Sequence, residues 1–199
     1  MRRLKVLAVE DEGLVAVALT AQLEDLGHQV VGLAKDGQEA IEYASRLEPD
    51  LVITDIRIPI TDGIETARAI LGHRPVPIVL LTAYADESLI HRAGEAGVMA
   101  YLLKPADKQQ LRSTIEVALA RFEELHALRR EVRDLKEALE MRKVVEQAKG
   151  VLMKRLRLPE AEAFRRMQQT SRSRRSNLQE IAATILRAEE LLAPFEENP

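Results

Sequence analysis

The sequence predicts an α/β domain with a doubly wound, five-stranded parallel sheet, followed by one long helix and a small all-α three-helix bundle. In the first half, short apolar runs alternate with amphipathic stretches, which is typical of a parallel sheet with helices on both faces. After residue 107 no strand-like run recurs, and apolar residues repeat at steps of three and four. That spacing indicates helices.

The predicted strands are apolar runs rich in Val, Leu and Ile. They cover residues 5–9, 29–34, 51–55, 78–82 and 100–103. Stretches with one apolar face predict helices over residues 13–26, 37–47, 63–72 and 87–96. The dipeptides Asp36-Gly37 and Asp62-Gly63 are turn or cap signals where two of these helices begin.

Reactive side chains stand where predicted strands end. Glu10-Asp11-Glu12 follows the first strand, Asp55 and Thr82 close the third and fourth, and Lys104-Pro105 follows the last. Each alone would also fit a helix cap or a turn. Because ligands bind beyond the carboxyl ends of parallel strands, the presence of all four, in order, favours one pocket.

The residue types in this pocket suit phosphoryl transfer. Carboxylates are hard ligands for Mg²⁺, and an aspartate beside a divalent cation can accept a phosphoryl group. Lys104 can neutralise the phosphoryl oxygens as a point charge, and the hydroxyl of Thr82 can donate a hydrogen bond to them. The sequence therefore predicts a phosphoacceptor site centred on Asp55.

The runs VLAVEDE, LVITDIRIPITDG, IVLLTAYAD and GVMAYLLKP resemble the receiver domain of two-component response regulators, over residues 1–120. The resemblance implies a flavodoxin-like fold and phosphorylation of Asp55 by a sensor histidine kinase. Such a domain accepts and slowly loses a phosphoryl group, so it is not an enzyme acting on an external substrate. The first acidic position, usually Asp in the family, is Glu10 here, which could alter metal affinity or dephosphorylation rate.

The same resemblance implies roles for individual residues. Glu10, Asp11, Asp55 and the backbone carbonyl of Arg57 would form a Mg²⁺ site. Thr82 and Tyr101 would be the switch residues, and Lys104 would contact the phosphate. The peptide bond before Pro105 would be cis.

Composition limits the class of protein and of partner. The chain has no cysteine, which excludes disulfides and thiolate metal sites. No apolar run approaches membrane-spanning length, so we expect a soluble, cytoplasmic protein with no membrane partner. The net charge of −3 hides a gradient: residues 141–188 hold 12 basic and four acidic side chains. This imbalance predicts an anionic partner for the C-terminal half.

Residues 108–140 predict a linker helix that continues the last receiver helix. Its apolar stripe comprises Leu111, Ile115, Ala118, Phe122 and Leu125 and, after one phase slip, Leu128, Val132, Leu135 and Leu139. Such near-heptad spacing is typical of a coiled coil, which would make a homodimer that activation could favour. In the alternative interpretation, the stripe packs on the chain's own domains.

The last part of the chain, residues 141–192, predicts helices over 141–156, 160–170 and 177–192, followed by a tail at 193–199. Its basic residues could neutralise nucleic-acid phosphates or form a solvated surface. The candidate RNA contacts are Lys149, Lys154, Arg155, Arg165, Arg166, Arg172, Arg174 and Arg175.

The segment KVVEQAKGVLMKRLRLPEAEAFRRMQQTSRSRRSNLQEIA resembles the ANTAR domain, an RNA-binding output module of transcription antitermination regulators. The resemblance implies binding to hairpins in the nascent messenger RNA leader. Gly150 lies inside a predicted helix, where it would permit close helix contact or the approach of a ligand. On physical grounds alone, an output that binds DNA or a protein partner remains the alternative.

Overall fold

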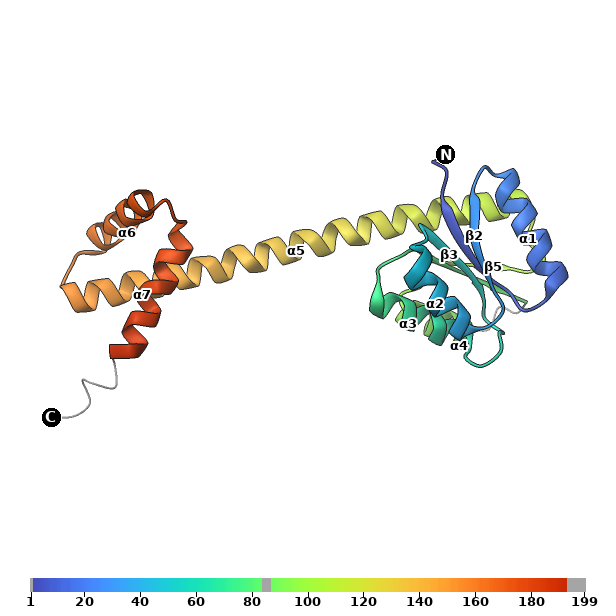
Figure 1. The fold of residues 1–199 in the computed structure, drawn as a ribbon, viewed down its shortest axis with the longest axis horizontal. Coiled ribbons are helices and arrows are strands. Elements are labelled where there is room, and N and C mark those ends of the chain that lie inside the picture. Colours follow the sequence, from blue (N-terminus) through green and yellow to red (C-terminus); the bar gives the residue numbers. More distant parts are fainter. Residues whose placement is uncertain (1, 84–86, 193–199) are drawn as a thin grey trace. The chain divides into compact units, whose positions relative to one another are not determined.

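The structure, a computed structural model, describes residues 2–83 and 87–192 (Figure 1). The end of the IVLLTAYAD run and the predicted tail, 193–199, lie outside the described residues. The chain divides into two compact units, Met1–Ala127 and Leu128–Pro199. None of the described helices is long and apolar enough to cross a membrane.

The described part of the first unit contains a five-stranded parallel sheet, which confirms the predicted fold class. Its strand order is β2-β1-β3-β4-β5. The bounds, which coincide with the predicted ones, are β1 (Lys5–Val9), β2 (Gln29–Ala34), β3 (Leu51–Asp55), β4 (Ile78–Thr82) and β5 (Ala100–Leu103).

The helices between the strands differ from the predicted ranges by no more than one residue at an end. They are α1 (Gly13–Asp25), α2 (Gly37–Leu47), α3 (Gly63–His73) and α4 (Glu87–Glu95). Asp36 caps α2 and Asp62 caps α3, because each carboxylate accepts a hydrogen bond from the backbone nitrogen three residues on, at 2.9 and 2.8 Å.

The core of this unit lies on both faces of the sheet, because successive strand residues point to opposite sides. Val6 and Ala8 of β1 pack towards α1 and the start of α5 (Lys108–Leu156). Leu7 and Val9 pack towards α2 and α3. The sheet is thereby buried on both faces, as a doubly wound fold requires.

Helix α5 is a single helix from Lys108 to Leu156, where the sequence predicted a separate helix from residue 141. The chain has no glycine or proline between residues 106 and 149, so nothing in this stretch breaks the helix. Gly150 is accommodated at a cost of about 1 kcal/mol. The helix ends before Arg157, whose φ is +52°.

The apolar stripe of α5 divides into two parts. Its first part packs in the first unit: Leu111, Ile115 and Ala118 are 0% exposed, and Phe122 and Leu125 are half-buried. In its second part the side chains are 44–63% exposed, and these are Leu128, Val132, Leu135 and Leu139. Packing on the chain's own domain therefore accounts for the first part only.

Two further helices complete the described part of the second unit, α6 (Glu160–Arg174) and α7 (Leu178–Leu192). They pack on the end of α5 around Ala148, Met167 and Ala182. Helix α6 runs four residues beyond its predicted end, because the serines and arginines that were expected to form a loop stay helical until Arg175 (φ +52°).

Helix α7 begins with a reciprocal capping box, as the spacing of Asn177 and Glu180 predicts. The backbone nitrogen of Glu180 donates to Asn177 Oδ1 at 2.8 Å, and the backbone nitrogen of Asn177 donates to Glu180 Oε2 at 3.3 Å. These bonds fix where the last helix starts after the arginine-rich end of α6.

Candidate functional site

The parallel register aligns the carboxyl ends of the inner strands. Asp55 of β3 lies opposite Leu81 of β4, and Thr82 lies opposite Leu103 of β5. Residue 10 directly follows β1, which pairs with the other edge of β3. Four side chains therefore lie at the carboxyl end of the sheet: Glu10, Asp55, Thr82 and Lys104. More than ninety residues of sequence separate the first from the last.

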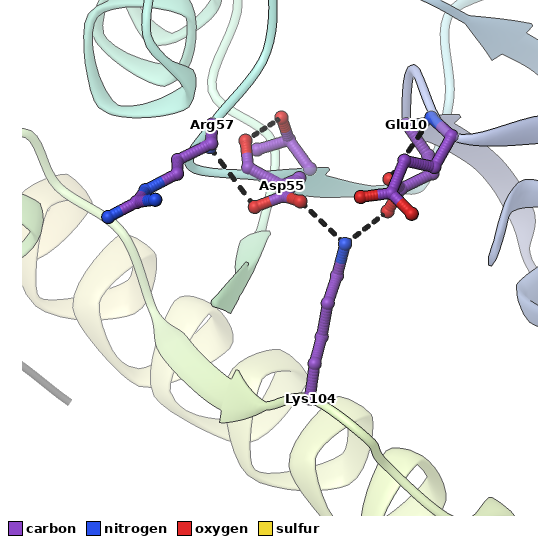
Figure 2. A network of polar contacts seen from close by, with 6 residues as sticks. Glu10, Asp55, Arg57 and Lys104 are labelled. Atoms are coloured by element: carbon purple, nitrogen blue, oxygen red, sulfur yellow. Dashed lines mark hydrogen bonds and ion pairs between the residues drawn. The ribbon is translucent and has the colours of Figure 1, made fainter. Parts of the chain in front are cut away.

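The Lys104 ammonium binds two carboxylates at this end of the sheet, as Figure 2 shows. Its Nζ lies 2.5 Å from Asp55 Oδ2 and 2.6 Å from Glu10 Oε2. The other oxygen of Asp55, Oδ1, accepts a hydrogen bond from the backbone nitrogen of Arg57 at 3.1 Å. Both carboxylates are nearly buried, with Glu10 1% and Asp55 8% exposed.

Burial and charge act against each other in this cluster. Burial raises the pKa of Glu10, although its hydrogen bond with Lys104 acts in the opposite direction. Burial alone would lower the pKa of Lys104, but the hydrogen bonds with Asp55 and Glu10 outweigh it and the pKa is raised. Lys104 therefore keeps its positive charge between the carboxylates.

The remaining predicted residues of the pocket lie at different depths. Thr82 is 6% exposed, and its carbonyl accepts a hydrogen bond from the backbone nitrogen of Lys104 at 2.8 Å. Asp11 is exposed, and so is Tyr101 at 45%. The Lys104–Pro105 peptide bond is cis. Among the described residues, no group of three or more acidic, histidine or cysteine side chains has a metal-binding arrangement.

Two parts of the chain match known family models. Residues 6–116 match the family model of the response regulator receiver domain, and residues 133–186 match that of the ANTAR domain. The chain belongs to the response regulators that carry an ANTAR domain. Its first unit contains the receiver, and its second unit contains the ANTAR domain.

Relatives support this assignment over most of the chain. The response regulator is 44% identical over 182 residues to the transcriptional regulatory protein PdtaR of Mycobacterium tuberculosis, which covers 92% of this chain and 89% of that protein. It is 39% identical over 105 residues to the transcriptional regulatory protein LnrK of Bacillus subtilis, covering 51% of this chain and 47% of that protein.

Solved structures resemble the receiver. One is the signal receiver domain of a modulated diguanylate cyclase from Desulfovibrio desulfuricans G20, with a TM-score of 0.57 and 35% identity, covering 61% of this chain and 98% of that one. Another is a LuxR-family response regulator from Aurantimonas, with a TM-score of 0.57 and 29% identity, covering 60% and 86%. This architecture fits a regulator rather than a catalytic enzyme.

Gly63 is a residue of the receiver pocket that the sequence interpretation treated only as a turn signal. A Cβ at this position would lie 1.9 Å from the backbone oxygen of Asp55. Its backbone nitrogen donates to the carbonyl of Ile56 at 2.8 Å. Glycine therefore lets α3 begin directly against the end of β3, and the Asp62-Gly63 dipeptide is the signal that marks it.

Arg92 of α4 is a second residue that the sequence interpretation missed. It binds Asp62 at 2.7 Å and approaches Glu65 at 3.8 Å, so it connects α4 to the start of α3. Burial acts to raise the pKa of Asp62, but hydrogen bonds from the Glu65 backbone and from Arg92 outweigh it and the pKa is lowered. No local motif reveals this contact, because thirty residues separate the partners.

The basic residues of the ANTAR domain fall into two groups. Four of the eight predicted RNA contacts make ion pairs with glutamates: Lys149, Arg155, Arg165 and Arg166. Lys149 is only 8% exposed and lies 2.7 Å from Glu160, so it holds the start of α6 to α5.

The other four are exposed and make no ion pair with any residue that the structure describes. They are Lys154, Arg172, Arg174 and Arg175. Gly150 is also exposed, and a Cβ there would meet no atom within 4 Å. Close contact between helices is therefore not the reason for a glycine at this position.

Proposed function

We propose that this response regulator accepts a phosphoryl group on Asp55 from a sensor histidine kinase, and that its ANTAR domain then binds a hairpin in a nascent messenger RNA leader to prevent transcription termination. The observation that carries the proposal is one chain that combines a lysine-held, nearly buried Asp55 with an ANTAR domain bearing exposed, unpaired cations.

The chemistry needs one nucleophile and compensation of charge. A carboxylate oxygen of Asp55 attacks the phosphorus of a phosphohistidine, the P–N bond breaks with its electron pair leaving on the imidazole, and an acyl phosphate forms. Lys104 Nζ lies 2.5 Å from Asp55 Oδ2, close to where the new phosphate oxygens would stand. Lys104 and Thr82 are thus the proposed phosphate contacts and Tyr101 the second switch residue.

The acidic pocket has the donors that Mg²⁺ prefers. Glu10 and Asp55 already approach one cation, the Lys104 ammonium, from two sides. With Lys104 between the two carboxylates, the described acidic side chains do not form a metal-binding arrangement as they stand. We propose that Glu10, Asp11, Asp55 and the backbone carbonyl of Arg57 move together to hold Mg²⁺. When bound, Mg²⁺ neutralises charge that develops on the transferred phosphoryl group.

A histidine kinase has a surface to dock on beside this pocket. Leu14 and Val17 of α1, which lie one helical turn apart, are 89% and 67% exposed and could contact a partner. A cavity of about 460 Å³ is lined by Leu14 together with Lys104 and Pro105. A kinase helix laid on this face would bring its phosphohistidine to Asp55.

The ANTAR domain presents phosphate contacts on its surface. Lys154, Arg172, Arg174 and Arg175 are the proposed RNA contacts, because no glutamate among the described residues neutralises them. Gly150 is four residues before Lys154 and therefore lies on the same face of α5. The missing side chain at Gly150 would let an RNA backbone approach the helix beside that lysine.

Dimerisation would connect the two events. The exposed stripe of Leu128, Val132, Leu135 and Leu139 has the spacing of a coiled-coil seam, and a second copy of the chain would bury it. Two ANTAR domains in one dimer would bind two RNA elements with an avidity that depends on their spacing. We propose that phosphorylation of Asp55 favours this dimer.

Phosphoryl labelling tests the first half of the proposal. With a small phosphodonor and Mg²⁺, we expect one phosphoryl group per chain, and none in an Asp55→Ala variant. Labelling that persists in that variant would remove Asp55 as the acceptor.

Competition binding tests the second half. Labelled hairpin RNA bound to the phosphorylated protein should resist competition by duplex DNA of equal length and equal salt. If duplex DNA displaces the RNA more efficiently than unlabelled hairpin does, the output is a DNA-binding domain.

A further inference from the structure

We propose that the ANTAR domain holds one unpaired base of its RNA hairpin in a pocket between α5, α6 and α7. This inference rests on the proposed RNA-binding function and adds the place where the RNA is read. Phosphate contacts position a nucleic acid but carry no sequence information, so a domain that selects particular hairpins needs a site for a base. The receiver and its phosphorylation site take no part in this pocket.

The pocket has an apolar floor. It has a volume of about 340 Å³ and lies within the ANTAR domain. Met167 and Ile181 form part of the floor and are 1% and 7% exposed, and Leu152 lines it from α5. A flat base would gain contact with these side chains on leaving water.

Two hydroxyl groups at the pocket have acceptor capacity for the edge of a base. Thr170 donates its hydroxyl proton to the carbonyl of Arg166 at 2.9 Å, and Thr184 donates to the carbonyl of Glu180 at 2.7 Å. Both threonines line the pocket. Because each proton is engaged, each oxygen is left as an acceptor for an N–H group.

Charge favours RNA over an apolar segment of a protein as the occupant. Arg174 lines the pocket and makes no ion pair with a described residue. Arg172 and Arg175, which are close to Arg174 in sequence, also make no ion pair with a described residue. Guanidinium groups stack on bases and bind phosphates, and unpaired loop bases are the parts of an RNA that can be splayed out. An apolar floor beside unneutralised arginines fits a base still attached to its phosphates.

A substitution that fills the pocket without changing charge tests the proposal. Ala188 is an exposed residue of α7 that lines the pocket. Alanine and methionine are both good helix formers, so Ala188→Met should retain the helix and put a long side chain across the opening. Gln179→Met is the matched control, because Gln179 is exposed on α7 and does not line the pocket.

The RNA probe is the tightest-binding stem-loop selected from a pool with a randomised loop, together with versions in which each loop base in turn is replaced by an abasic site. For the full-length wild-type protein, we expect one abasic position to weaken binding roughly tenfold or more, the range of one specific base contact. Ala188→Met should weaken binding of the intact stem-loop by a similar factor. In this variant, the abasic site at that position should cause no further loss of affinity. Gln179→Met should behave as wild type.

Three results would overturn the inference while leaving RNA binding intact. In the first, Ala188→Met binds the stem-loop as wild type does. In the second, the loss of binding free energy caused by Ala188→Met adds in full to the loss caused by each abasic site. Such additivity would mean that the two changes act independently. In the third, Ala188→Met alters self-association alone, which would make the pocket a protein contact.

Two further observations complete the test. Failure of the wild-type protein to bind any selected stem-loop would instead remove the proposed function, and this inference with it. Thr184→Val, which keeps the shape and removes the acceptor, gives an independent reading. It should reduce the difference in affinity between RNAs that carry different bases at the same loop position. The salt dependence of RNA binding should stay unchanged.

Discussion

Lys104 explains how two carboxylates can lie side by side in the receiver with little exposure to water. Its single charge lies within 2.6 Å of both Glu10 and Asp55. Burying one unpaired carboxylate is strongly unfavourable, and two adjacent ones would also repel. A phosphoryl group added to Asp55 would bring new anionic oxygens into a site whose positive charge is already shared. Under the proposed function, phosphorylation of Asp55 would therefore redistribute the contacts of Lys104.

Substitution of Gly63 should disturb the receiver. A Cβ placed 1.9 Å from the Asp55 oxygen must displace backbone, so we expect Gly63→Ala to lower the free energy of unfolding by about 3 kcal/mol. Gly72→Ala in the same helix meets no atom within 4 Å and should raise it by about 0.5–1 kcal/mol. All three tyrosines lie within the first 101 residues, so tyrosine fluorescence during urea unfolding reports on the receiver. Equal effects of the two substitutions would contradict the close contact at Gly63.

His28 should make the receiver sensitive to acid. It is 3% exposed, and neither ring nitrogen has a hydrogen-bond partner among the described residues. Burial lowers the pKa of His28, and the N-terminal ammonium lowers it further. The unfolded chain therefore binds this proton more readily, so its contribution to stability is present above about pH 6.5 and is lost as the pH falls towards the lower folded pKa.

Replacement of His28 separates its effect from other titrations. Tyrosine-monitored urea unfolding across this pH window should give a shallower loss of stability for His28→Leu than for wild type. His91→Gln is the control, because the His91 side chain is 77% exposed on α4. Parallel pH profiles for wild type and His28→Leu would exclude the buried histidine as the cause.

At the scale of elements, the strands of the receiver could be predicted because each is a short apolar run bounded by charged residues, glycine or proline. The same pattern predicts that Glu10, Asp55 and Lys104 lie together, because the carboxyl ends of parallel strands lie at the same end of the sheet. The division of the α5 stripe could not be predicted. Ile115 and Leu135 have the same apolar character, and only tertiary packing buries the first and leaves the second exposed.

The pairing of basic residues was equally hidden in the sequence. Arg155 meets Glu189 and Lys149 meets Glu160, across 34 and 11 residues respectively. Spacing along the chain gives no indication of such contacts, because they depend on how α6 and α7 pack on α5. Composition could show an excess of positive charge, but not which cations the domain itself neutralises.

Gly150 provides a test of the α5 surface. Gly150→Ala should stabilise the ANTAR domain by about 1 kcal/mol, because alanine is the better helix former and its Cβ would meet no atom within 4 Å. If an RNA backbone approaches this face, the same substitution should weaken hairpin binding. Hydrogen exchange of α5 amides measures the first effect, and Gln147→Ala, on an exposed neighbouring position, is the control. Unchanged RNA affinity would place the RNA elsewhere on the domain.

At the scale of the whole molecule, the exposed seam should control self-association. In sedimentation velocity with beryllofluoride and Mg²⁺, we expect wild-type protein to shift towards a dimer and Leu135→Gln to remain monomeric, since the side chain of Leu135 is 63% exposed on the seam. Glu137→Gln lies on the opposite side of the same helix and should dimerise like wild type. Dimerisation of Leu135→Gln to the same extent would exclude the seam as the interface.

The proposed function joins the two units of this response regulator through one event, the phosphorylation of Asp55. The most direct test is the affinity of full-length protein for a selected hairpin RNA, measured with and without a phosphodonor and Mg²⁺ at fixed salt, for wild type and Asp55→Ala. We predict that phosphorylation tightens wild-type binding by at least about tenfold, as expected when two linked modules engage together, and leaves Asp55→Ala unchanged. Equal affinity of the wild-type protein in both conditions, or an increase that survives in Asp55→Ala, would contradict the account.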